Sequence, residues 1–341
     1  MRIGCVCYAT TQGLGYLAKD FWDHGVVHEV MIFAHPGGRE THREWYPAET
    51  PVIHARPFKG PHVDRFLSSV DAVLFFETPF DWQFLGVCAE RGIKTVLVPM
   101  YEWFPERPPG SFDKLICPSL LDLEIFATRM PQTPATFLTI PPKHGTWRLR
   151  EKAEHFIHNA GHIGSRNHKG TEELLAAIPL VTSDARFTIR CQDERGLRRL
   201  IAGAPAVATD RRVKFVFGEV GRNELFADGD AYVAPEKYNG LSLPLQEAFA
   251  AGMAVLTTDR FPISQWLPQR ALIPAESTRR IRVHSSCIEI DESIVAPEAI
   301  AAKIDEFCGA DISDLSDAGR QWAKANSWQN LKDRWVEEIA S

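Results

Sequence analysis

A carboxylate follows closely behind a glycine-containing loop in residues 238–259, Tyr-Asn-Gly-Leu-Ser-Leu-Pro-Leu-Gln-Glu-Ala-Phe-Ala-Ala-Gly-Met-Ala-Val-Leu-Thr-Thr-Asp. Pro244 suits the first turn of a helix, where its missing amide would have no partner, and Gly252 suits the helix exit. Glu247 lies off the apolar stripe of this helix, near its start, where the helix dipole favours negative charge. The segment therefore predicts a carboxylate and several free amides facing a ligand above the sheet edge.

A basic loop with several glycines precedes a second predicted helix. The loop Gly161–Gly170 contains Arg166 and Lys169 and leads into a helical pattern from Thr171 to Ile178. Backbone amides, the helix dipole and two cationic side chains together favour binding of a diphosphate. Taken alone, the loop is equally compatible with a solvated basic turn.

A glycine turn follows the first predicted strand. Gly13, Leu14 and Gly15, with Ala18, satisfy the dinucleotide fingerprint G-x-G-x-x-A. That fingerprint also requires an acidic residue about 20 positions later to hold a ribose, and the second strand ends Phe-Ala-His-Pro-Gly without one. An NAD enzyme is therefore disfavoured, and the turn either contacts another phosphate or only packs the helix on the strand.

A third group of polar and aromatic side chains follows two other predicted strands. Glu102 lies between Tyr101 and Trp103, and Asp81 follows an earlier strand. Carboxylates at this edge can bind hydroxyl groups, and aromatic rings can stack on a ring of the ligand. Anchoring of the loop by buried aromatic side chains is the alternative.

The sequence does not predict a metal site. His155 and His158 would point to opposite faces of one strand, so they cannot readily converge on one ion. Asp228-Gly-Asp230 has the letters of a metal-binding motif, but it reads as the turn before a strand. Nucleophile-elbow, HExxH and Walker lysine motifs are all missing from the sequence.

Composition indicates a soluble globular protein in a reducing compartment. The net charge of −6 gives no general attraction to nucleic acid or anionic lipid. Seven cysteines occur without a CxxC pair, which argues against a disulfide framework. No apolar run approaches the roughly 18 residues of a membrane span, and the N-terminus reads as a strand rather than a signal peptide. We expect a cytoplasmic protein without stable membrane insertion.

Strand-like and helix-like segments alternate along all 341 residues, which predicts α/β layers around parallel sheets. The run Pro-Pro-Lys-His-Gly at 141–145 interrupts this alternation and reads as a linker. We therefore expect two doubly wound Rossmann-like domains that face each other across a cleft. Their predicted bounds are 1–145 and 146–315, and a C-terminal helix at 316–341 is expected to cross back to the first domain.

These motifs resemble the retaining glycosyltransferases with the GT-B fold, in particular the large group 1, or family 4, glycosyltransferases. Lys169-Gly170 matches the family's Gly-Arg…Lys-Gly element, and Glu247 matches the second of its two glutamates. Asn239 replaces the first of those glutamates. Tyr101 and Glu102 stand where the family commonly has the histidine and aspartate of a Val-His-Asp segment.

The resemblance implies transfer of a sugar from a nucleotide diphosphate sugar, of UDP or GDP type, to an acceptor hydroxyl. It implies retention of anomeric configuration, no metal, and no cofactor besides the sugar donor. Glu247 would bind the ribose, while Lys169 and Arg166 would neutralise the diphosphate. The other residues it places at the donor are Gly13, Leu14, Gly15, Asn239, Gly240, Leu241 and Ser242, and those at the acceptor side are Tyr101, Glu102, Trp103 and Asp81.

Two alternatives remain open at this point. Asn239 carries no charge, which leaves a non-catalytic nucleotide-sugar-binding protein possible, and an epimerase can use the same fold. The acceptor is also open: a saccharide, another small molecule, or a hydroxylated base in phage-type DNA that is flipped into the cleft. The last of these would need Lys59, Arg65 and Arg107 along one rim. The sequence leaves the oligomeric state undetermined.

Overall fold

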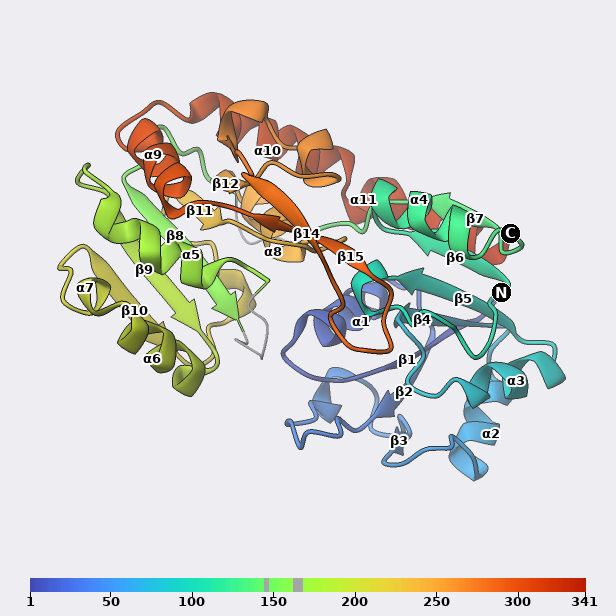
Figure 1. The fold of residues 1–341 in the computed structure, drawn as a ribbon. Helices are drawn as coiled ribbons and strands as arrows, with labels where there is room; N and C mark the ends of the chain where they lie inside the picture. The colour runs from blue at the N-terminus through green and yellow to red at the C-terminus, as the bar shows by residue number, and fades with distance from the viewer. Residues whose placement is uncertain (144–146, 162–167) are drawn as a thin grey trace. The chain divides into compact units, whose positions relative to one another are not determined.

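A computed structural model describes residues 1–143, 147–161 and 168–341. The chain forms two compact units, which Figure 1 shows as two α/β bodies. Unit 1 consists of Met1–Pro141, His284–Ile288 and Ser327–Ser341. Unit 2 consists of Pro142–Val283 and Glu289–Asn326.

Unit 1 is built on a seven-stranded parallel sheet with the order β3-β2-β1-β4-β5-β6-β7. The first strand has β2 on one side and β4 on the other, so the strand order reverses beside β1. In such sheets ligands bind outside the carboxyl ends of the strands near this reversal. The strands are β1 (Ile3–Cys7), β2 (Glu29–Phe33), β3 (Val52–Ile53), β4 (Ala72–Glu77), β5 (Lys94–Pro99), β6 (Lys114–Cys117) and β7 (Ala135–Phe137).

The helices of unit 1 come from both ends of the sequence. Trp335 on the C-terminal helix is fully buried and packs edge-on against Phe21, with ring centroids 4.8 Å apart. Its indole Nε1 donates to the carbonyl of Thr139 at 3.2 Å. The C-terminal helix therefore completes the core of unit 1. The helices are α1 (Gly13–Asp23), α2 (Pro61–Ser68), α3 (Gln83–Glu90), α4 (Leu120–Arg129) and α11 (Trp328–Ala340).

Unit 2 contains a six-stranded parallel sheet with the order β10-β9-β8-β11-β12-β13. A separate antiparallel hairpin, β14 (Ser277–Ile281) with β15 (Ile290–Ile294), follows it and is drawn in orange in Figure 1. The sheet strands are β8 (His155–Gly161), β9 (Arg186–Cys191), β10 (Val213–Phe217), β11 (Ala231–Ala234), β12 (Ala254–Thr258) and β13 (Leu272–Ile273).

Helices cover both faces of this second sheet. Successive side chains of a strand point to opposite faces, so two neighbouring residues of β8 show what packs on each face. Phe156 packs in a core with α5 and α9, whereas the next residue, Ile157, packs in a core with α8. The predicted class of two doubly wound Rossmann-like α/β domains is therefore confirmed. The helices are α5 (Thr171–Ala177), α6 (Glu194–Gly203), α7 (Pro205–Ala208), α8 (Leu243–Ala250), α9 (Pro297–Phe307) and α10 (Ser313–Ala325).

Within the ranges that the structure describes, every helix is too short or too polar to cross a lipid bilayer.

Candidate functional site

The loop before α8 is held in place by a buried charged pair. Ser242, the residue before the helix, has a left-handed backbone with φ of 50°. Its hydroxyl donates to Oε2 of Glu236 at 2.6 Å, and Arg260 Nη2 lies 3.2 Å from the same carboxylate oxygen. Glu236 is fully buried. An unfavourable backbone conformation at the helix start is thus stabilised by a carboxylate and a guanidinium beneath it.

Asn239 closes the turn that leads to this helix. Its side-chain Oδ1 accepts a hydrogen bond from the amide of Ser242 at 3.1 Å. A short polar side chain that binds a backbone amide three residues later is typical of turns before helices. Asn239 therefore shapes the loop that carries Gly240 and Leu241.

Glu247 lies in α8 with only 6% of its surface exposed. Arg222 binds its carboxylate, with Nη2 2.6 Å and Nε 3.1 Å from Oε1. This arginine comes from the short 3-10 turn Arg222–Glu224, which follows β10. Arg222 was not predicted as a site residue. It directly follows the run 218–221, which begins and ends with glycine, and a basic residue at such a loop can bind an anionic group.

The residues on either side of Lys169 pack against the loop before α8. Arg166 lies outside the described residues. Gly170 has φ of +70°, and a Cβ atom there would lie 2.2 Å from the carbonyl oxygen of Pro235. The amide of Lys237 donates to the carbonyl of His168 at 2.7 Å. Only glycine permits this close approach of the two backbones.

Electrostatics link Lys169 to both carboxylates. Burial lowers the pKa of Lys169, and the charges of Glu236 and Glu247 act in the opposite direction. In the part of this site that the structure describes, three cations, Lys169, Arg222 and Arg260, thus accompany two carboxylates, which leaves one net positive charge beside the amino end of α8. That surplus and the helix dipole favour an anionic ligand.

The glycine turn at the start of α1 has two different glycines. A Cβ on Gly15 would lie 2.0 Å from the carbonyl oxygen of Thr10, so close packing excludes any side chain there. A Cβ on Gly13 would meet nothing within 4 Å. Gly15 is therefore required by the fold, while Gly13 borders open space.

The segment after β5 forms a short 3-10 helix, Tyr101–Trp103. Tyr101 and Glu102 are buried, whereas 46% of the Trp103 surface is exposed. Asp81 is also buried, and its two oxygens accept backbone hydrogen bonds from Phe58 at 2.7 Å and Gln83 at 3.1 Å. Asp81 thereby fixes the backbone around the end of β4.

Two further carboxyl groups lie at the same edge of the sheet and were missed from the sequence. Glu77 ends β4 with a left-handed backbone, φ 65°. Asp122 is fully buried and accepts from the amide of Tyr101 at 3.0 Å. Burial, together with the nearby Glu102, raises the pKa of both Glu77 and Asp122 to about 8. Both groups are therefore mainly protonated at neutral pH.

The histidines and aspartates of unit 2 that were considered as metal ligands bind protein groups. His158 uses Nδ1 with the carbonyl of Val233 at 2.6 Å and Nε2 with Thr171 Oγ1 at 2.7 Å. Asp230 accepts from the amide of His155 at 2.9 Å. Over 1–143, 147–161 and 168–341, no three His, Cys, Asp or Glu side chains are grouped as a metal site requires.

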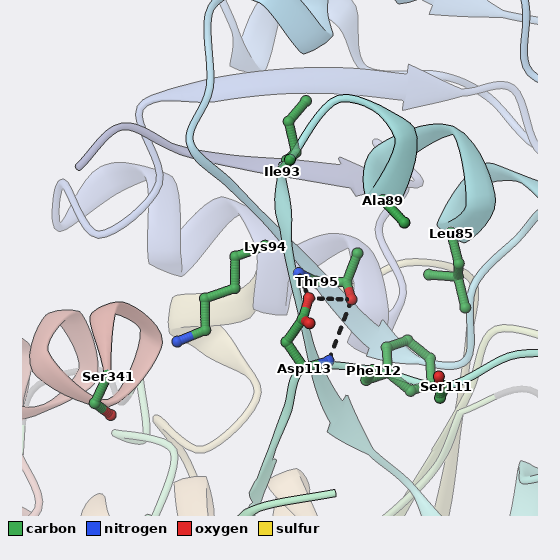
Figure 2. Close-up of a pocket in the computed structure, with 10 residues that line it drawn as sticks. Leu85, Ala89, Ile93, Lys94, Thr95, Ser111, Phe112, Asp113 and Ser341 are labelled. Carbon is green, nitrogen blue, oxygen red and sulfur yellow. Dashed lines mark hydrogen bonds between the residues drawn. The ribbon is translucent and has the colours of Figure 1, made fainter.

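A hollow of about 530 Å³ lies elsewhere on unit 1, at the start of β5 (Figure 2). Lys94, Thr95 and Asp113 supply its polar lining, and Asp113 Oδ2 accepts from the amide of Thr95 at 2.7 Å. These residues stand at the amino ends of β5 and β6. The hollow is thus at the opposite ends of these strands from Glu77 and Glu102.

Residues 155–278 match the family model of the group 1 glycosyl transferases. The matched range contains Lys169, Arg222, Asn239 and Glu247, which are the residues gathered around α8. No curated protein matches the sequence.

Solved structures share the whole fold at low sequence identity. A glycosyltransferase from Rickettsia africae has a TM-score of 0.69 and 14% identity, over 100% of this chain and 98% of its own. HepE from Anabaena, solved with UDP and glucose, has a TM-score of 0.66 and 11% identity, over 100% and 99%. Sucrose-phosphate synthase from Thermosynechococcus elongatus has a TM-score of 0.62 and 13% identity, over 100% and 97%.

The protein is a glycosyltransferase with the GT-B fold. The predicted enzyme class is confirmed by the matched domain, and the predicted fold by its structural neighbours. In this glycosyltransferase, Glu77, Glu102 and Asp122 fall outside the matched range, so the family model gives no information on the carboxyl groups of unit 1.

Proposed function

We propose that this glycosyltransferase transfers a sugar from a nucleotide diphosphate sugar, of UDP or GDP type, to an acceptor hydroxyl. The observation that carries the proposal is the grouping of Lys169 and Glu247 at the loop before α8, with one net positive charge. The structural similarity to HepE, whose structure contains UDP and glucose, supports a donor of this type. The donor is a co-substrate, and the proposal needs no other cofactor.

The ribose and the diphosphate of the donor bind different residues in this proposal. Glu247 accepts hydrogen bonds from the ribose hydroxyls. Lys169, Arg166 and the amides of Gly240, Leu241 and Ser242 stabilise the diphosphate as the bond to the sugar breaks. Loss of one such donor to a developing charge costs about 2.7 to 4 kcal/mol in barrier.

The proposal also includes retention of the anomeric configuration and a reaction that needs no metal ion. Fixed cations and the dipole of α8 supply charge stabilisation at the leaving group, which is the part that a divalent ion plays in other transferases. Retention follows from the family resemblance, through attack on the face that the phosphate leaves. Asn239 contributes through its amide group, because its Oδ1 already binds Ser242.

The test is binding and hydrolysis of UDP-, GDP-, ADP- and dTDP-sugars by the wild type and by Glu247→Ala. We expect one sugar nucleotide to raise the melting temperature and to release its diphosphate slowly, and Glu247→Ala to lose both effects. If none of the sugar nucleotides binds to the wild type, the proposed donor is wrong.

A non-catalytic nucleotide-sugar-binding protein is the second candidate, and the neutral Asn239 is the observation that favours it. The same experiment separates the two candidates. Binding of a sugar nucleotide without any release of diphosphate, with or without added acceptors, would select the binding protein.

A further inference from the structure

Aromatic side chains gather at the carboxyl ends of β1, β2 and β4. The ring centroid of Tyr8, just after β1, lies 4.1 Å from that of Phe80 and 4.8 Å from that of His35. All three side chains are half-buried, so part of each ring is accessible. We call Tyr8, His35 and Phe80 the aromatic platform.

The platform lies beside Glu77. The ring of Phe80, which lies 4.1 Å from that of Tyr8, belongs to the residue three positions after Glu77. The charge of Glu77 also contributes to the raised pKa of Tyr8, which agrees with this proximity. Aromatic rings and a carboxyl group thus meet at one point of the sheet edge.

The carboxyl group of Glu77 forms no hydrogen bond or ion pair with another described residue. Neighbouring carboxyl groups such as those of Asp81 and Asp122 do form hydrogen bonds. Its left-handed backbone, φ 65°, is uncommon for a residue other than glycine, and such conformations concentrate at functional sites. The amide of Thr78 donates to the carbonyl of Phe76 at 2.8 Å, which closes a tight turn around Glu77. The carboxyl group, in contrast, has no hydrogen-bond partner among the described residues.

The chemistry of this edge fits a sugar ring. The C–H face of a pyranose is apolar and stacks on aromatic rings, while a carboxyl group binds its hydroxyls. Glu77, Glu102 and Asp122 lie along the same edge, and each is close enough to influence another electrostatically. Because Glu77 and Asp122 are mainly protonated at neutral pH, they present neutral hydrogen-bonding groups, which suit the hydroxyls of a sugar.

We propose that the aromatic platform and Glu77 form the acceptor subsite, in which a saccharide ring stacks on Tyr8 and Phe80 and one of its hydroxyls binds Glu77. This inference rests on the proposed function, since it names the acceptor of the same transfer. His35 borders the ring from β2. The specificity for the acceptor then resides in the ends of β1, β2 and β4, outside the group 1 domain.

The test measures binding of methyl α- and β-glycosides of glucose, galactose, mannose and N-acetylglucosamine to the full chain with UDP present. Saturation-transfer NMR on the wild type should show contact between aromatic protons and the C–H face of one glycoside. Tyr8→Ala and Glu77→Leu should each weaken that binding by about tenfold. Tyr8→Phe should retain it, and so should Glu77→Gln, because a neutral amide replaces a mainly protonated carboxyl group. Trp45→Ala is the matched control, because Trp45 also belongs to a half-buried stack of unit 1, with Tyr16 at 5.4 Å.

Glycoside binding that is equal in the wild type, Tyr8→Ala and Glu77→Leu would overturn the proposal. So would the absence of any glycoside binding, including the case in which duplex DNA containing hydroxymethylcytosine binds instead. Glu77→Leu has nearly the size of the original residue, so it remains informative if Tyr8→Ala fails to fold. The affinities for UDP and GDP are measured in parallel: absence of both refutes the proposed donor, whereas a Tyr8-dependent glycoside site would stand without them.

Discussion

Arg222 directs two hydrogen bonds, from Nε at 3.1 Å and Nη2 at 2.6 Å, to one carboxylate oxygen of Glu247. Both side chains are largely buried, with 11% and 9% of their surfaces exposed. Such a pair fixes the orientation of the carboxylate as well as balancing its charge. Removal of one partner leaves a buried charge without its counter-ion, which typically costs about 3 to 5 kcal/mol. Arg222 is therefore a positioning residue for the group that we assign to the ribose.

We predict that Arg222→Met weakens binding of UDP by at least about tenfold, because Glu247 loses its orientation. Binding of inorganic pyrophosphate, which has no ribose, should change little. Isothermal titration with both ligands measures the effect. Arg222→Met combined with Glu247→Gln should be no worse than Glu247→Gln alone, and an additive loss in the double variant would show that Arg222 acts independently of Glu247.

We predict that Lys169→Met lowers kcat by about 100- to 1000-fold, because its charge stabilises the leaving diphosphate. Donor hydrolysis at saturating sugar nucleotide measures this change. Lys237→Met is the matched control, since Lys237 lies in the neighbouring loop before α8 but its ammonium group binds Glu173 at 2.5 Å. Equal turnover in Lys169→Met and the wild type would disprove the role of Lys169.

The two glycines at the start of α1 should respond differently to alanine. Gly15→Ala places a methyl group 2.0 Å from a backbone oxygen of Thr10, and we expect a loss of about 1 to 3 kcal/mol in the free energy of unfolding. Gly13→Ala meets no atom within 4 Å, so its melting temperature should equal that of the wild type. Thermal unfolding of both variants is the measurement. A strong destabilisation by Gly13→Ala would contradict the open space found at this position.

The buried Asp122 predicts a loss of stability as the pH rises. Burial and Glu102 raise its pKa from the ordinary 3.8 to about 8, so the folded protein binds this proton more tightly than the unfolded chain does. The associated stabilisation is complete below about pH 4 and is lost as the pH rises towards 8. Asp122→Asn keeps an oxygen for the amide of Tyr101 and does not titrate, so its melting temperature should fall less steeply between pH 5 and 8 than that of the wild type. Identical pH profiles would contradict the raised pKa.

Local patterns were sufficient to predict much of the fold. The helical pattern predicted from Thr171 to Ile178 is observed as α5, which ends at Ala177 and continues into a 3-10 turn at Ile178. The hairpin of β14 and β15 was not predicted, because Ser-Thr-Arg-Arg-Ile lacks the alternation of a half-buried strand. Its strands are joined by cross-strand ion pairs such as Arg280 with Asp291 at 3.1 Å, which become visible only once the register is known.

The candidate site was predictable where the motif is local and not where it depends on long-range contacts. The loop before α8 and the glycine at position 170 follow from short sequence patterns. Arg222 reaches Glu247 from another turn of the chain, and no spacing rule connects the two positions. Glu77 reads in the sequence as the polar end of an apolar strand, and only its backbone conformation and its aromatic neighbours set it apart.

The helix that supplies Trp335 to unit 1 is the last one along the chain. On the ribosome, residues 1–141 emerge long before this helix is made, so the ring of Phe21 lacks its partner while the whole of unit 2 is being synthesised. Premature termination at residue 326 should therefore yield an insoluble product rather than a smaller working enzyme, and a soluble, folded fragment would contradict this. Unit 1 can therefore complete its core only after α11 has been synthesised.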